Sequence, residues 1–444
     1  MKKVTEPLLP YVNQEMLHPE FWLSNMINQT TLSGSKNRHL DTAHYTFEQC
    51  NQILHSYSSH LADLRLLATE AAREPRTPLV LDRIVHASPD NRILFDGEGH
   101  PLDDALWKSL AENAHTHVAD AHIRPAVSVR PAAVRRWPTA TAAFRTPKDR
   151  EFDQFQDTVL HTGDPLLITH TSGDGMWLYG ISETYAGWIR QDNLALTDWD
   201  TFNDWITTRL DGIVIAQTGI HTQPNPYNPR VSENPVEFGA ILHPNRKFAH
   251  EHWGTQTLVG NLPVLLPIRQ TDGELTLDTA FLRRQLGVHP QLLKFSRKSV
   301  LTVAFRLLGE RYGWGGSFGT HDCSSFIMDV YRMMGIQLPR DAGAQEKSWP
   351  DRVEFSPWAG PEQRCHVLSK FAAGDLLYMP GHALMYLGTH GGRPYVLHDF
   401  SGYQDSTTGQ HVHVNEVMVS SLDLPVSADK TFLTALTSAI SLFC

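Results

Sequence analysis

The sequence has few cysteines and no long apolar run. Its 444 residues contain four cysteines, Cys50, Cys323, Cys365 and Cys444, which lie far apart and form no C-x-x-C pair. This spacing argues against a zinc knuckle or a disulfide framework, although one or two pairs could form in an oxidising compartment. No stretch approaches the ~20 apolar residues of a membrane-spanning helix, so we expect no membrane span.

An excess of positive charge is also absent, because the net charge is −10 and is spread along the chain. Nucleic-acid binders need a basic stripe to meet phosphates, so we expect no nucleic-acid partner. The opening stretch MKKVTEPLLPYVNQEM has two lysines but lacks the apolar segment of a secretory signal. As written, the chain is expected in the cytoplasm, or in the cell envelope or periplasm if an export signal was removed.

The pattern of the chain changes at three points, and a chain of this length should hold two to four domains. Residues 1–113 read as a helical and irregular segment. In residues 114–198, short apolar runs alternate with Gly/Asp turns, as in a small β-barrel. Residues 199–292 repeat this pattern around a loop rich in Pro and Asn, and residues 293–444 mix helices with strands.

The segment THDCSSFIMD predicts that Cys323 lies in the first turn of a helix. Apolar residues recur after it at Phe326, Ile327 and Val330, and Gly335 is a suitable C-cap. The free N–H groups and the dipole of a helix N-terminus favour a thiolate, the reactive form of cysteine. A buried, inert cysteine is the more common alternative on composition alone.

Two histidines on neighbouring predicted strands could activate such a cysteine. His382 opens a strand directly after the turn at Pro380 and Gly381, and His398 lies in the next strand, YVLHDF. Adjacent antiparallel strands can place two such side chains side by side on one face. A thiol at a helix start, a base and an orienting group make up the catalytic set of a cysteine hydrolase.

Two other uses of these residue types are disfavoured. Cys365 and His366 are adjacent in sequence, and on a strand they would point to opposite faces, so we do not expect them to form a dyad. A metal site made of Cys323, His382 and His398 would lack a fourth ligand. We therefore expect no metal and no other cofactor.

Residues 294 to about 420 resemble the NlpC/P60 family of papain-like cysteine peptidases. The matching pieces LLGERYGWGG, HDCSSF, LPRDAGAQ, FAAGDLLYM, GHALMYLG and YVLHDFSG occur in the order of the family. The gaps of 59 residues from Cys323 to His382 and of 16 residues from His382 to His398 are similar to the family's arrangement. Two positions depart from the family's pattern. The family usually has glycine where this chain has Ser325, and it often has Val-Gly where this chain has Ala383-Leu384.

The resemblance extends upstream and implies a multidomain fold. Residues 118–198 resemble a bacterial SH3 domain, and the pieces WKSLAENAH and RRWPT resemble the leader and first SH3 domain of a YkfC-like subgroup. That subgroup has two small all-β SH3-like barrels before an α+β papain-like catalytic domain. The implied domains are a helical N-terminal segment at 1–113, barrels at 114–198 and 199–292, and the catalytic domain at 293–444.

By this resemblance, Cys323 attacks the scissile carbonyl, His382 transfers the proton and His398 orients His382. Tyr312 resembles a tyrosine that hydrogen-bonds near the scissile bond, and Trp314 is expected in the pocket wall. Further expected substrate-binding residues are Asp322, Ser324 and Asp341.

Among these, Asp341 matches an aspartate that meets the free amine of an N-terminal L-alanine in the YkfC-like subgroup. Helix N-capping is an equally good explanation for Asp341, because Asp is a favoured cap.

The family cleaves the bond between γ-D-glutamate and a diamino acid, usually meso-diaminopimelate, in peptidoglycan-derived peptides. We therefore expect such peptides as partners and a monomeric γ-D-glutamyl-L-diamino acid endopeptidase. An amidase or acyltransferase of the same superfamily is one alternative. A non-catalytic wall-binding protein with SH3 modules is another, although the complete set of Cys323, His382 and His398 argues against it.

Overall fold

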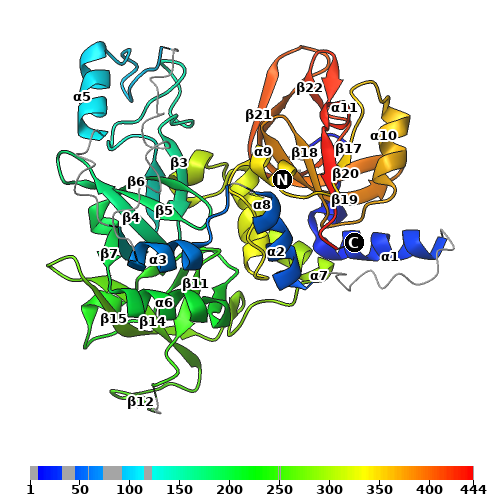
Figure 1. Ribbon diagram of the computed structural model, residues 1–444. Coiled ribbons are helices and arrows are strands. Elements are labelled where there is room, and N and C mark those ends of the chain that lie inside the picture. The colour runs from blue at the N-terminus through cyan, green and yellow to red at the C-terminus, as the bar shows by residue number, and fades with distance from the viewer. Residues whose placement is uncertain are drawn as a thin grey trace, which may run out of the picture. The chain divides into compact units, whose positions relative to one another are not determined.

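The chain passes back and forth between two units. The computed structural model describes residues 9–32, 46–58, 60–73, 93–114, 123–248, 250 and 252–443 (Figure 1). Unit 1 consists of residues 1–58, 294–312 and 320–444, and unit 2 consists of residues 59–293 and 313–319. The short stretch 313–319 therefore belongs to unit 2, although its neighbours in sequence belong to unit 1.

Unit 1 is built on a six-stranded antiparallel sheet with the order β17-β24-β18-β19-β20-β21. Helix α8 (Cys323–Arg332) packs against β19 (His382–His390) and β20 (Arg393–Gln404). The other strands of this sheet are β17 (Val353–Glu354), β18 (Leu376–Met379), β21 (His411–Ser421) and β24 (Ser438–Ile440), and a separate pair is formed by β22 (Pro425–Ser427) and β23 (Lys430–Thr431). The other helices are α1 (Pro19–Leu32), α2 (Phe47–Tyr57), α7 (Arg297–Ala304), α9 (Ala342–Lys347), α10 (Pro361–Leu368) and α11 (Phe432–Ala435).

One face of this sheet carries an apolar core that surrounds the strand histidines. Val396 and Phe400 of β20 belong to this core together with Phe432 of α11. Because strand residues alternate between faces, His398 lies on the same face as Val396 and Phe400. Its ring stacks on Phe400 with a centroid distance of 3.9 Å and meets Phe432 edge-on at 5.3 Å. The core therefore fixes the orientation of His398.

Unit 2 contains two antiparallel sheets, each with its own buried core. The first has the order β3-β2-β6-β5-β4-β1-β7, with β1 (Arg124–Ser128), β2 (Ala132–Arg135), β3 (Gln156–Leu160), β4 (Pro165–Thr171), β5 (Trp177–Ser182), β6 (Ala186–Arg190) and β7 (Leu194–Leu196). The second has the order β15-β14-β11-β8-β16, with β8 (Ile213–Ile215), β11 (Ile241–Pro244), β14 (Asn261–Arg269), β15 (Leu275–Arg283) and β16 (Val288–His289). Two small pairs are β9 (Ile220–His221) with β10 (Pro235–Val236) and β12 (His252–Trp253) with β13 (Gln256–Thr257). The helices are α3 (Leu64–Arg73), α5 (Asp104–Ala114) and α6 (Trp199–Thr208).

Helix α6 was not predicted, because residues 199–292 were expected to contain strands and loops alone. Asp198 caps the helix by accepting a 2.8 Å hydrogen bond from the Thr201 N–H. Phe202 and Trp205, three residues apart, are buried, and the Trp205 indole donates to the Gly163 carbonyl at 2.8 Å. A favoured cap followed by apolar residues at helical spacing is a helix signal that the sequence contained.

In the expected N-terminal segment, the described residues include helices α1, α2, α3 and α5. Other parts of that segment, including residues 74–92, lie outside the described residues. Within the described ranges, no helix has both the length and the apolar character needed to cross a membrane.

Candidate active site

Cys323 is the first residue of α8, as predicted, and a reciprocal capping box fixes this helix start. The Asp322 carboxylate accepts a 3.0 Å hydrogen bond from the Ser325 N–H, and the Ser325 hydroxyl accepts one of 2.9 Å from the Asp322 N–H. Two free N–H groups are thereby satisfied. The serine that departs from the family's glycine therefore has a role here, which is to hold the turn that carries Cys323.

A buried arginine that was not predicted lies under the same turn. Arg340 donates through both terminal nitrogens to the Asp322 carboxylate, and donates to the Ser324 hydroxyl at 2.9 Å. The three side chains are each less than 10% exposed. Asp322 and Ser324, predicted as pocket residues, are therefore engaged in a buried, charge-assisted network. The sequence signal for Arg340 was its place in LPRDAGAQ, directly before Asp341.

The two predicted histidines are brought together, and a third side chain continues the chain of hydrogen bonds. His382 Nε2 lies 2.8 Å from His398 Nδ1, and His398 Nε2 lies 2.8 Å from the Ser420 hydroxyl. His398 and Ser420 are fully buried. Because Nε2 of His382 is used by His398, Nδ1 is the ring nitrogen that remains for proton exchange with a thiol. Ser420, on the neighbouring strand β21, was not predicted.

The Cys323 thiol lies beside the backbone on either side of His382. Its Sγ is 3.9 Å from the Gly381 carbonyl oxygen, and the Ala383 N–H forms a hydrogen bond that lowers the thiol pKa. Within the described chain, no hydrogen bond joins Sγ to the His382 ring. Catalytic hydrogen bonds commonly tighten only when substrate binds, so this apo geometry is compatible with a Cys–His pair.

Burial determines the resting protonation of this pair. Burial and then the Asp322 carboxylate raise the pKa of the Cys323 thiol to about 12. Burial lowers the pKa of His382 to about 4, while Asp322 opposes this shift. Desolvation thus outweighs the helix N-terminus, which alone favoured a thiolate. The resting forms are a thiol and a neutral imidazole.

Tyr312, Asp341 and Trp314 occupy different surroundings. Tyr312 precedes α8 and is held by a 2.9 Å bond from its N–H to the Asn415 carbonyl, and burial keeps the pKa of its phenol raised. Asp341 is exposed at the N-cap position of the short helix α9, but its side chain makes no capping hydrogen bond there. Trp314 belongs to unit 2, in η7 (Trp314–Gly319), where its ring meets Phe152 at a centroid distance of 5.8 Å.

A cluster of buried ionisable groups adjoins the turn that carries Cys323 and was not predicted. His321 Nδ1 hydrogen-bonds to Glu310, and His321 Nε2 lies 3.2 Å from Asp329. Burial lowers the pKa of His321, but these two carboxylates raise it to about 10. Asp399, beside His398 in β20, is fully buried, and burial raises its pKa to about 9.

The other cysteines are separate from this site. Cys50 in α2 and Cys365 in α10 are free thiols, and Cys444 lies outside the described residues. The assumption that Cys365 and His366 lie on a strand was wrong, because both belong to helix α10, which begins at Pro361. Adjacent helical residues also point in different directions, so the expectation of no dyad remains a prediction.

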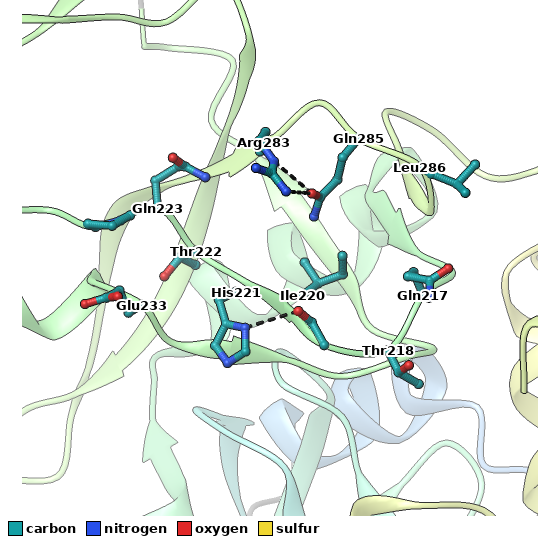
Figure 2. Close-up of a pocket in the computed structure, with 12 residues that line it drawn as sticks. Gln217, Thr218, Ile220, His221, Thr222, Gln223, Glu233, Arg283, Gln285 and Leu286 are labelled. Carbon is teal, nitrogen blue, oxygen red and sulfur yellow. Dashed lines mark hydrogen bonds between the residues drawn. The ribbon is translucent and has the colours of Figure 1, made fainter. Parts of the chain in front are cut away.

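A polar groove lies elsewhere in unit 2, beside β9 and the end of β15 (Figure 2). It is open to solvent and has a volume of about 700 Å³. Exposed charged side chains on its walls include Glu233 and Arg283, and Arg283 donates to Gln285. The groove contains none of the predicted site residues, so the candidate active site rests on the set around Cys323.

Two parts of the chain match known protein families. Residues 309–435 match the NlpC/P60 family, and residues 142–190 match an SH3 domain of the SH3b1 type. The chain is 32% identical over 92 residues to the Gamma-D-glutamyl-L-lysine dipeptidyl-peptidase of Bacillus subtilis (strain 168), covering 20% of this chain and 31% of that protein. It is 28% identical over 120 residues to Dipeptidyl-peptidase 6 of Lysinibacillus sphaericus, covering 26% and 39%. The matches thus span 31% and 39% of the length of these two relatives.

A solved NlpC/P60 endopeptidase from Photobacterium damselae subsp. piscicida has a similar fold along almost the whole chain. The TM-score is 0.63 at 18% identity, covering 97% of this chain and 93% of that one. This likeness concerns the fold, including the β-rich region that precedes helix α8. The chain therefore contains an NlpC/P60 domain, preceded by an SH3 domain of the SH3b1 type.

Proposed function

We propose that this chain is a cysteine peptidase of cell-wall peptides, which cleaves the bond between γ-D-glutamate and a diamino acid. The observation that carries this proposal is the hydrogen-bonded pair of His382 and His398 beside a buried cysteine at a helix start. The relative named as a Gamma-D-glutamyl-L-lysine dipeptidyl-peptidase supports the substrate class. Peptidoglycan-derived peptides are the proposed partners.

In the proposed reaction, His382 acts as a general base because the resting thiol is neutral. Nδ1 of His382 takes the proton as Sγ of Cys323 attacks the γ-glutamyl carbonyl. The N–H of Cys323 at the helix start stabilises the resulting oxyanion. The His382 imidazolium then protonates the leaving amine of the diamino acid, and water releases the γ-glutamyl product by the reverse sequence. His398 keeps the imidazole oriented throughout.

Recognition of a free N-terminal L-alanine is proposed for Asp341. Its exposed carboxylate makes no capping bond to α9, which supports a role in binding an ammonium group. A carboxylate that pairs with the amine would discriminate against peptides whose alanine is still amide-linked to the glycan. Tyr312, Asp322 and Ser324 complete the proposed substrate-binding set, with Arg340 holding the latter two in place.

The proposed domain organisation is the one that the resemblance to the YkfC-like subgroup implies. We assign residues 114–198 and 199–292 to two SH3-like barrels and residues 293–444 to a papain-like catalytic domain. The two separate cores of unit 2 support the assignment of two barrels. Residues 1–113 form the proposed helical N-terminal segment.

Hydrolysis of defined peptides tests the proposed activity. L-Ala-γ-D-Glu-meso-diaminopimelate, its L-lysine analogue and the N-acetylmuramoyl-linked forms should be compared with purified full-length protein. We expect cleavage of the γ-glutamyl bond in the free peptides and loss of cleavage in Cys323→Ala. The matched control Cys365→Ala, a half-buried cysteine of α10, should keep full activity.

Three outcomes would contradict the proposal. Undiminished hydrolysis by Cys323→Ala would show that Cys323 is not the nucleophile. Cleavage at another bond would favour an amidase or acyltransferase, and binding without hydrolysis would favour a wall-binding protein.

For Asp341→Asn we expect the preference for free over linked alanine to fall about tenfold or more, since hydrogen bonds to charged groups contribute roughly 1.5–3 kcal/mol.

A further inference from the structure

Ser420 ends the chain of hydrogen bonds that begins at the catalytic base. It lies in β21 and pairs across the sheet with Val396, two residues before His398. Its hydroxyl is 2.8 Å from His398 Nε2, and both residues are fully buried. Water therefore does not compete for this end of the chain, and whether the serine hydroxyl donates or accepts is linked to which nitrogen of His398 carries the proton.

Two proton arrangements satisfy the two 2.8 Å contacts. In the first, His382 Nε2–H donates to His398 Nδ1, and His398 Nε2–H donates to the Ser420 oxygen. In the second, every bond is reversed, so that the Ser420 hydroxyl donates to His398 Nε2 and His398 Nδ1–H donates to His382 Nε2. A neutral His382 then carries its proton on Nδ1 and cannot accept another there.

We propose that Ser420 is a positioning residue whose oxygen accepts the Nε2–H of His398, and that it thereby holds His382 in the tautomer with a free Nδ1. This inference rests on the proposed function, in which His382 is the base. It identifies a third side chain, on a separate strand, behind the two histidines.

The buried surroundings of His382 and His398 keep both rings neutral. Burial lowers the pKa of His382 to about 4 and lowers that of His398 well below its ordinary value, and a charge on either ring disfavours a charge on the other. Each ring therefore holds one proton in the resting site, so the two arrangements described are the relevant ones.

The same arrangement serves the step after proton transfer. When Nδ1 of His382 takes the thiol proton, the imidazolium still carries its Nε2–H and still needs an acceptor on His398. The first arrangement supplies that acceptor without any movement of protons. No proton passes to His398 or Ser420, and the proton on His382 leaves with the amine.

Ring-nitrogen NMR of the full-length protein tests this directly. In wild type labelled with ¹⁵N histidine, assigned through His382→Gln and His398→Gln, we expect a protonated Nε2 and an unprotonated Nδ1 on both rings. Protonated Nδ1 on His398 would overturn the proposal. This readout needs no substrate, so it decides the tautomer even if the peptides proposed above are not cleaved.

Two serine variants connect the tautomer to activity. Ser420→Ala removes the acceptor, and we expect mixed tautomers and a kcat lowered about tenfold with little change in KM, the effect of one neutral hydrogen bond. Ser421→Ala is the matched control, because Ser421 is equally buried, points to the other face and accepts from the Asp423 N–H at 3.1 Å. Ser420→Thr keeps the hydroxyl and should restore both the tautomer and kcat.

The outcomes separate a positioning role from simple loss of structure. Equal loss of kcat in Ser420→Ala and Ser421→Ala would contradict the proposal, as would an unchanged tautomer in Ser420→Ala. If Ser420→Ala does not fold, the wild-type spectrum and Ser420→Thr still decide the matter. Residual activity in Cys323→Ala would instead refute the proposed function and leave the tautomer result standing.

Discussion

Replacing Asp399 with asparagine should stabilise unit 1 by an amount that grows with pH. Asp399 is fully buried, and neither carboxyl oxygen has a hydrogen-bond partner within the described chain. Burial raises its pKa from 3.8 to about 9; His321 opposes this shift, and the nearby carboxylates of Asp322, Glu310 and Glu416 add to it. The unfolded chain therefore releases this proton at a much lower pH than the folded chain does.

The size of the effect follows from linkage. Because the folded pKa is the higher one, the proton's contribution to stability is fully present below pH 3.8 and is lost as pH rises toward 9. Each pH unit in this window corresponds to about 1.4 kcal/mol. Between pH 5 and pH 7 the wild type should therefore lose about 3 kcal/mol of unfolding free energy relative to Asp399→Asn. The uncharged amide of the variant changes the unfolding free energy by the same amount at every pH, so it adds no pH dependence.

Amide hydrogen exchange of β20, followed by mass spectrometry, is a suitable assay because it reports on this strand separately from unit 2. Comparing wild type and Asp399→Asn at the same pH cancels the intrinsic pH dependence of exchange. Asp405→Asn is a control on the same hairpin, because the pKa of Asp405 is lowered by its bond from the Thr408 N–H. A difference between wild type and Asp399→Asn that does not change from pH 5 to pH 7 would refute the reasoning.

Three further changes have predicted outcomes. Arg340→Met removes the guanidinium that pairs with the buried Asp322 carboxylate, and should lower the unfolding free energy by about 3–5 kcal/mol in urea titrations. His321→Gln removes an imidazolium whose pKa is raised to about 10, so the stability advantage of the wild type should be full below pH 6.5 and shrink toward pH 10 in thermal melts. Gly315→Ala should destabilise unit 2 by at least about 1–2 kcal/mol in urea titrations, because φ is 60° and a Cβ would lie 2.5 Å from the Gln156 carbonyl oxygen. For each of the three changes, an unaltered stability would contradict the contact on which the prediction rests.

Local patterns in the sequence predicted the elements that carry the proposed catalytic residues. The apolar spacing after Cys323 gave the helix, and the turn at Gly381 gave the start of β19, because both signals depend on neighbours within a few residues. The pairing of His382 with His398 followed from their positions on consecutive strands. These features could be predicted because a short stretch of chain determines each of them.

The contacts around the site could not be predicted in this way. Arg340 meets Asp322 across 18 residues, and Ser420 meets His398 across 22 residues, from elements whose relative register the sequence does not state. The raised pKa of Cys323 has the same origin, because burial by distant segments opposes the local effect of the helix N-terminus. The protonation of Cys323 therefore depends on burial by segments that are distant in sequence, which local patterns do not reveal.

The stretch 313–319 has a consequence for how this protein can be divided. It lies between Tyr312 and Cys323 in sequence, yet it packs on β3 of unit 2, where the Gln156 side chain donates to the Gly315 carbonyl at 2.9 Å. A fragment that begins at residue 294 would carry this stretch without its packing surface. The region from residue 294 onward therefore cannot be exchanged on its own, and replacing the sheet that contains β3 would leave residues 313–319 without the surface on which they pack.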